Sequence, residues 1–377
     1  MENSRTLAQP KFIFPIDGDV VMPADGTING DALEVTVRIL AESRSRVTVN
    51  GLEAKPSGEG GEGMCEYEVT FPFVCYRTTL DAVCEKDGMT SRKVIFVFRF
   101  KNAYKKMRLA LDDIIWSMRA LAENDYKSIY DCPFFAIFKR LRNDFGICVH
   151  MNIYYTDREG FDLTMMPDKY KEEFIANSDW MKLTFHAYAD SPSRIYRFAP
   201  YSEVYRDYNL VTNEILRFAG KETMNTAANG LHFGETTVEG ARALRDCGVK
   251  CLVGYYVFDS NGDPYVSYYL DKEMTRHCFD RDFWVDNKEQ IVFSKDKMVI
   301  DAHKLENIRP FLNNWRDNRP TEAGILNLVT HEQYFYERFS AYQPDYERKI
   351  RTACAWGREN GYEPCFISDV IKEDYPF

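Results

Sequence analysis

The sequence lacks any long cluster of lysine and arginine residues, and its formal net charge is -10 at pH 7. Proteins that bind nucleic acid or an anionic membrane surface through electrostatics need a basic patch or stripe. The composition therefore predicts neither a nucleic-acid partner nor a membrane partner. Neutral or cationic partners fit this charge better.

Two kinds of hydrophobic segment are also missing. No apolar run approaches the roughly 20 residues that cross a bilayer as a helix. The first residues, MENSRTLAQP, have neither the basic region nor the hydrophobic region of a secretory signal peptide. We therefore expect a cytoplasmic location. The ten cysteines are scattered, mostly inside apolar runs such as GICVHM, and this favours reduced, buried thiols over disulfides.

What is present is enough apolar sequence for a large core, since 45% of the 377 residues are hydrophobic, and the length favours two domains. Residues 12 to about 101 form short alternating segments, such as ALEVTVRI and KVIFVFRF, separated by turn signals at Asn50-Gly51 and Asp87-Gly88. This pattern predicts an immunoglobulin-like antiparallel β-sandwich over residues 1–102.

After residue 102 the pattern changes to alternating strands and helices. The apolar run MRLALDDIIW, residues 107–116, reads as a buried strand and belongs to the first of seven or eight β/α units over residues 103–377. Such a series predicts a (β/α) barrel in one domain. A doubly wound sheet is the alternative fold, but no glycine-rich turn follows the first strand to support dinucleotide binding.

Acidic and histidine residues recur where the predicted strands of this second domain end. Asp112 and Asp113 close the first strand, while His186, His232 and His331 lie in KLTFHAYAD, NGLHFGE and ILNLVTHEQ. In β/α architectures the chemistry collects at the carboxyl ends of the strands, because side chains from different strands converge there. The sequence therefore predicts one functional site built from these residues.

Four phrases carry a resemblance to a known family: LALDD, HAYAD, HFGETTVEGARALRDCGVK and LVTHEQ. They resemble the motifs of the polysaccharide deacetylases, carbohydrate esterases whose fold is a distorted (β/α)7 barrel. The resemblance covers residues from about 105 to 377. The first hundred residues resemble the accessory sandwich modules attached to bacterial glycan-active enzymes. Together these likenesses imply an immunoglobulin-like sandwich followed by a distorted (β/α)7 barrel.

The resemblance also implies roles for individual residues. Asp112 would be the general base, His331 the general acid, and Asp113 and His186 metal ligands. The family has a second histidine four residues after the first, where this chain has Asp190. We predict Asp190 as the third ligand and keep His232 as the alternative. The residues predicted to line the substrate site are His232, Phe233, Glu235 and Trp116.

The implied cofactor is a divalent metal, with zinc as the default and nickel, cobalt or manganese compatible with ligands of this type. A metal with an open coordination position activates water for attack on an amide or ester carbonyl. The implied activity is removal of an N- or O-linked acetyl group from a glycan or sugar derivative.

Two other functions remain open at this stage. A glycoside hydrolase would use Asp112 or Asp113 with a partner such as Glu235 or Glu332 as its two carboxylates. A degenerate barrel without activity would bind glycans and leave them unchanged, with aromatic residues such as Trp116 stacking on the sugar rings.

Overall fold

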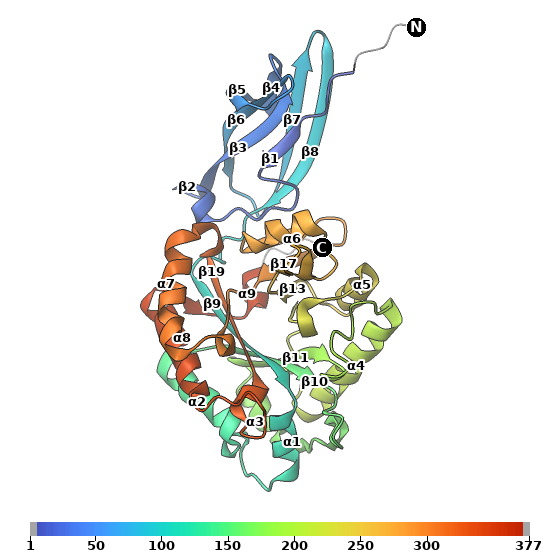
Figure 1. Ribbon diagram of the computed structural model, residues 1–377, viewed down its shortest axis with the longest axis vertical. Coiled ribbons are helices and arrows are strands. Elements are labelled where there is room, and N and C mark those ends of the chain that lie inside the picture. Colours follow the sequence, from blue (N-terminus) through green and yellow to red (C-terminus); the bar gives the residue numbers. More distant parts are fainter. Residues whose placement is uncertain (1–5, 372–377) are drawn as a thin grey trace. The chain divides into compact units, whose positions relative to one another are not determined.

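A computed structural model describes residues 6–371 of the chain (Figure 1). The chain divides into two compact units. The first comprises Met1–Tyr104 and the short segment Phe283–Lys288, and the second comprises Lys105–Asp282 and Glu289–Phe377. Within the described residues, no helix combines the length and the apolar character that crossing a membrane requires.

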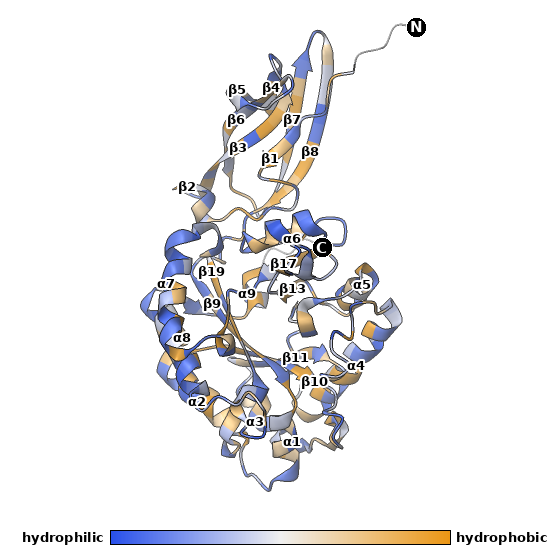
Figure 2. Ribbon diagram, in the orientation of Figure 1, coloured by the Kyte–Doolittle hydropathy of each residue, from blue (hydrophilic) through white to orange (hydrophobic). Residues whose placement is uncertain are grey.

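The first unit is built from one antiparallel sheet of eight strands, whose hydrogen-bonded order is β1-β3-β6-β5-β4-β7-β8 with β2 on β3. Its strands are β1 (Lys11–Phe14), β2 (Gly26–Asn29), β3 (Ala32–Glu42), β4 (Arg46–Val49), β5 (Leu52–Glu59), β6 (Met64–Phe73), β7 (Arg77–Lys86) and β8 (Met89–Phe98). The buried side chains of these strands form one cluster, so the curved sheet wraps around a single core. Along β8, hydrophilic residues predominate in the first half of the strand and hydrophobic residues form its second half (Figure 2).

The predicted immunoglobulin-like sandwich is therefore wrong, because a sandwich consists of two separate sheets. Strand β5 joins the two halves here. Its first residues, Leu52–Ala54, pair with β4, and its later residues from Lys55 onward pair with β6. Alternation of hydrophobic residues predicts strands but not a change of partner within one strand. The segment Phe283–Lys288 contributes β16 (Phe283–Asp286) to this unit, and Val285 N–H donates to the Gly18 carbonyl at 2.8 Å.

The second unit contains two parallel sheets. The larger has the order β11-β10-β9-β19-β18, with β20 also on β9, and the smaller includes β12-β13-β17. Their strands are β9 (Lys106–Ile114), β10 (Val149–Tyr154), β11 (Met181–Ala187), β12 (Ala228–Asn229), β13 (Cys251–Gly254), β17 (Ile291–Lys295), β18 (Met298–Val299), β19 (Ile325–His331) and β20 (Glu363–Pro364). A hairpin of β14 (Val257–Phe258) and β15 (Pro264–Val266) follows β13.

Helices flank these sheets. Helices α2, α7 and α8 lie side by side along one flank, and α4 lies along β11 (Figure 1). The helices are α1 (Trp116–Glu123), α2 (Pro133–Phe145), α3 (Lys171–Ala176), α4 (Tyr201–Phe218), α5 (Val238–Asp246), α6 (Lys272–Phe279), α7 (Ile308–Asn318), α8 (Tyr346–Glu359) and α9 (Ile367–Ile371).

The predicted distorted (β/α)7 barrel is also wrong, since its strands would form one closed sheet. Here β12 pairs with β13 and not with β11, and β17 pairs with β13 and not with β18. Strands β12 and β18 have only two residues each, which is too short for a continuous ladder to close the ring. The hairpin and α6 between β13 and β17 also interrupt the alternation of strands and helices.

Candidate metal and catalytic site

A pocket of about 400 Å³ lies at the carboxyl ends of β9, β10, β11 and β19, and we call it the main pocket. Its lining residues are Asp112, Asp113, Ile115, Trp116, Tyr154, Thr156, Asp157, Glu159, His186, Asp190, His232, Phe233, His331, Gln333, Tyr334 and Phe339. Five of these are carboxylates and none is lysine or arginine, among the residues that the structure describes. A pocket of this charge attracts cations.

Two irregularities near the end of β9 turn the consecutive side chains of Asp112 and Asp113 into the main pocket. In a regular strand, neighbouring side chains point to opposite faces. Against β10, however, Met151 pairs with Leu111 and Ile153 pairs with Ile114, so β9 has one extra residue at Asp112 and Asp113. Asp113 also has a φ of 65°, in the left-handed region. Such a bulge re-aims side chains, and as a result both acids line the pocket.

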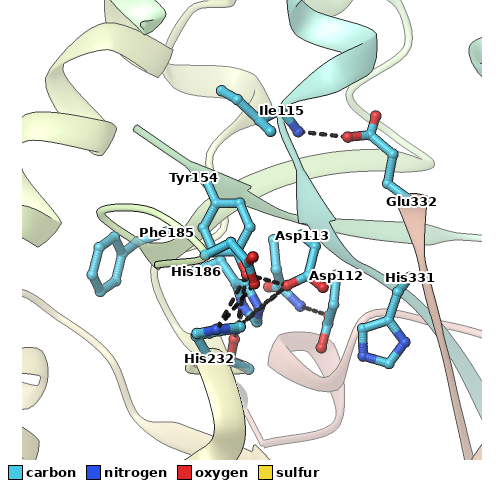
Figure 3. Close-up of polar contacts among 12 residues, drawn as sticks. Asp112, Asp113, Ile115, Tyr154, Phe185, His186, His232, His331 and Glu332 are labelled. Carbon is cyan, nitrogen blue, oxygen red and sulfur yellow. Dashed lines mark hydrogen bonds and ion pairs between the residues drawn. The ribbon is translucent and has the colours of Figure 1, made fainter. Parts of the chain in front are cut away.

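Asp113, His186 and His232 form a buried group that could hold a metal ion, because one ligand atom from each lies within 4.8 Å of the others. Asp113 Oδ1 is 3.0 Å from His186 Nε2 and 3.4 Å from His232 Nδ1, and the two histidine nitrogens are 3.3 Å apart (Figure 3). Carboxylate oxygen and imidazole nitrogen are ligands of zinc and of related divalent metals.

The hydrogen bonds around His186 suit a metal ligand. Its Nδ1 lies 2.5 Å from the Gly230 carbonyl oxygen, which can only accept, so Nδ1 carries the proton. Nε2 faces Asp113 and His232, and its lone pair would be available to a metal ion when the ring is neutral. Metal-binding histidines typically have a second ring nitrogen fixed in this way by a carbonyl or carboxylate.

Electrostatics favour an ionised Asp113 in this group. Burial raises the pKa of Asp113, but hydrogen bonds from His186 and His232 lower it, and the balance holds it well below its usual range. For His186, burial lowers the pKa, whereas Asp112 and Asp113 raise it, and the net shift is upward. The hydroxyl of Tyr154 donates to Asp113 and lies 2.8 Å from His232 Nδ1. Burial raises the pKa of Tyr154 well above its usual range, so this hydroxyl stays protonated.

Asp112 lies beside this group and has a different partner. Its Oδ1 accepts a hydrogen bond from Asn152 Nδ2 at 2.5 Å, which orients the carboxylate within the main pocket. Along the parallel pair of β9 and β19, Asp112 is in register with His331. The carboxylate of Asp112, which can accept a proton, therefore lies next to the imidazole of His331 on the neighbouring strand.

His331 is held by a buried acid. Its Nδ1 is 3.1 Å from Asp301 Oδ2, and its backbone N–H donates to Asp301 Oδ1 at 2.9 Å. Burial lowers the pKa of His331, but Asp301 and then Asp113 and Asp112 raise it, giving about 10. The ring is therefore protonated at neutral pH, with Nε2 as the N–H that is not engaged by Asp301.

Glu332 follows His331 in the sequence and binds the backbone at the start of α1. Its carboxylate accepts hydrogen bonds from the backbone N–H groups of Ile115 at 2.7 Å, Trp116 at 2.7 Å and Ser117 at 2.8 Å. These N–H groups begin α1 and would otherwise lack partners. Burial raises the pKa of Glu332 to about 7 although the three N–H groups lower it. Glu332 thus connects the end of β19 to the segment directly after Asp113.

The other predicted site residues lie as follows. Asp190 lines the main pocket, but its side chain is 73% exposed, and it stands outside the ligand group with its Oδ1 3.8 Å from His232 Nε2. His232, predicted for the substrate, takes the third place in the group. Phe233 and Trp116 line the main pocket, whereas Glu235 does not and instead forms a two-bond ion pair with Arg194.

Sequence reasoning missed Tyr154, Asn152 and Asp301. Tyr154 is the last residue of β10, and Asp301 lies two residues after the end of β18 in the phrase MVIDAH. The same strand-end rule that selected the histidines would have found both residues. Asn152 precedes the strand end by two residues, so it shares a strand face with Tyr154.

A scan against models of protein families and a search of curated protein sequences found no match for this chain.

Proposed function

We propose that the second unit is a metal-dependent hydrolase that removes an acetyl or related acyl group from a carbohydrate. The observation that carries the proposal is the Asp113–His186–His232 group, placed beside Asp112 and His331 in one pocket. Zinc is the default ion for this donor set, and cobalt, nickel and manganese also accept such ligands. Three protein ligands leave a coordination position open for water or substrate.

When bound, the metal would supply Lewis acidity, which activates water and polarises the carbonyl of an amide or ester. Asp112, held by Asn152, would accept the proton of the attacking water. His331 would donate the proton on its Nε2 to the nitrogen or oxygen that leaves. Its pKa of about 10 keeps it in the proton-donating form at neutral pH.

Aromatic lining supports a carbohydrate substrate. Trp116, Tyr334 and Phe339 line the main pocket together with hydrogen-bonding groups, and sugars are bound through their flat apolar faces and their hydroxyls. The exposed guanidinium of Arg338 lies 3.8 Å from the centre of the Trp116 ring.

The glycoside hydrolase alternative has less support from the geometry. It needs two carboxylates that face the scissile bond. The partners considered for that role, Glu235 and Glu332, do not line the main pocket. Glu235 is paired with Arg194, and Glu332 is engaged by three backbone N–H groups.

The test is acetate release from N-acetylated and O-acetylated sugars by protein loaded with zinc, cobalt, nickel or manganese. We expect turnover that a chelator abolishes and added metal restores. Asp112→Asn should keep the metal and lose turnover by roughly 10²–10⁴, because the base takes no part in metal binding. Acetate release that persists under chelation, or is unchanged in Asp112→Asn, would contradict the proposal.

A further inference from the structure

A second, smaller pocket of about 160 Å³ adjoins the main pocket. It shares three lining residues with the main pocket, namely Asp112, Phe233 and His331. Its other lining residues include Leu231, Val253, Val266, Asp296, Val299 and Val329. The proposed base and the proposed acid therefore both face the two pockets.

This pocket lies where the two parallel sheets fail to join, so we call it the inter-sheet pocket. Val253 on β13 and Val266 on β15 line one side, and Val299 on β18 and Val329 on β19 line the other. A closed barrel would have filled this space with paired strands. The short β18 and the β14–β15 hairpin leave it open instead.

The chemical character of the inter-sheet pocket differs from that of the main pocket. Four valines, Leu231 and Phe233 contribute apolar side chains to its walls, and among the described lining residues the acids are Asp112 and Asp296. Arg108 Nη1 is 3.2 Å from Asp296 Oδ1 and compensates the charge of this buried carboxyl. The pocket thus suits an apolar group, whereas the larger and more polar main pocket suits a hydroxylated sugar.

We propose that the inter-sheet pocket receives the acyl part of the substrate and selects acyl groups larger than acetyl, such as butyryl or benzoyl. This inference rests on the proposed function. The carbonyl carbon must lie where both Asp112 and His331 reach it, and the inter-sheet pocket begins at that point. An apolar cavity of roughly 150 Å³ holds a benzene molecule. An acetyl methyl group would leave most of a space of about 160 Å³ empty, whereas a longer acyl group gains by filling it.

Binding of product carboxylates tests the size of the pocket without any need for turnover. Acetate, propionate, butyrate and benzoate would be titrated into the full chain, with and without zinc, and followed by ligand-observed NMR. Each added methylene that is buried should tighten binding roughly fourfold, so butyrate should bind at least about tenfold more tightly than acetate. Equal affinities for acetate and butyrate would overturn the proposal.

A variant with a matched control shows where the preference arises. Val266→Phe fills the inter-sheet pocket and should abolish the preference for butyrate while acetate binding changes little. Val257→Phe is the control, because Val257 is the cross-strand partner of Val266 in the same hairpin and does not line the pocket. Val299→Leu fills the pocket from the opposite wall and serves if Val266→Phe melts at a lower temperature than the parent. A preference that survives in both filling variants would contradict the proposed location.

Hydrolysis of N-acetyl and N-butyryl glucosamine separates this inference from the proposed function. Faster release of butyrate than of acetate in the parent, reversed in Val266→Phe, supports both. Equal rates that neither filling variant changes overturn the inference and leave the hydrolase function standing. A butyrate preference in binding, without hydrolysis of either sugar, overturns the hydrolase function and leaves the inter-sheet pocket as an apolar acyl-binding site.

Discussion

On one side of the main pocket, Asp113, His186 and His232 contact one another. On the other side, His331 is held by Asp301, and the adjacent Glu332, which does not line the pocket, is held by backbone N–H groups. The first arrangement leaves ligand atoms that face a common point. In the second arrangement Asp301 fixes the ring of His331, and three backbone N–H groups fix Glu332. The difference supports the proposal that the first side binds a metal ion and that His331, on the second side, donates a proton.

Removing the imidazole of His331 should reduce activity as strongly as Asp112→Asn does. We expect His331→Ala to lower turnover by roughly 10²–10⁴, because the leaving group loses its proton donor. The metal should remain, since His331 is outside the ligand group. Steady-state kinetics and metal analysis of the same preparation measure both effects. His303→Ala is the control, as His303 does not line either pocket. Unchanged turnover in His331→Ala would remove this residue from the mechanism.

Removing the carboxylate of Glu332 should affect stability. In Glu332→Ala, the backbone N–H groups of Ile115, Trp116 and Ser117 lose their acceptor in a buried position. We expect a cost of about 2–3 kcal/mol in the free energy of unfolding. That corresponds to a fall in melting temperature of roughly 4–12 °C for a unit of this size.

The matched control is Glu337→Ala, an exposed glutamate in the same loop that should leave the melting temperature almost unchanged. Equal melting temperatures of Glu332→Ala and the parent would show that Glu332 does not hold the start of α1.

Weakening the partner of His331 should have a smaller effect that depends on pH. Asp301 is the main group that raises the pKa of His331 to about 10. In Asp301→Asn that pKa should fall toward the ordinary value of about 6.5. The proton-donating form would then be lost at a lower pH. The alkaline limb of the kcat/KM profile should therefore shift to lower pH.

The same shift has a consequence for stability. A raised histidine pKa contributes stability that is fully present below about pH 6.5 and is lost as the pH rises through the folded-state value. That loss falls between pH 6.5 and about 10 in the parent, and Asp301→Asn should flatten it. An alkaline limb at the same pH in both proteins would contradict the role of Asp301.

The sequence could predict much of the site because one physical rule governs it. Parallel strands converge at their carboxyl ends, and Asp112, Asp113, His186 and His331 all lie at such ends. The choice between Asp190 and His232 as third ligand could not be made in that way. Asp190 follows β11 in an irregular segment, and His232 lies in a turn where Phe233 has a φ of 60°. Neither backbone path follows from hydrophobic periodicity.

The same limit explains the two errors in the fold. Alternation predicted strands in both units, but the sheet partners of a strand depend on its length and on where it bends. Strand β5 changes partner after Ala54, and β12 and β18 are too short to close a barrel. Pairing of this kind is a long-range property, and the local pattern of residues does not contain it.

The most direct test of this account is the metal content of the protein, measured by mass spectrometry after purification without chelators and reconstitution with one equivalent of zinc. The parent and His331→Ala should each retain close to one ion per chain, and His186→Ala should retain almost none. An ion lost from the parent, or one retained in His186→Ala, would contradict the assignment of Asp113, His186 and His232 as the metal site.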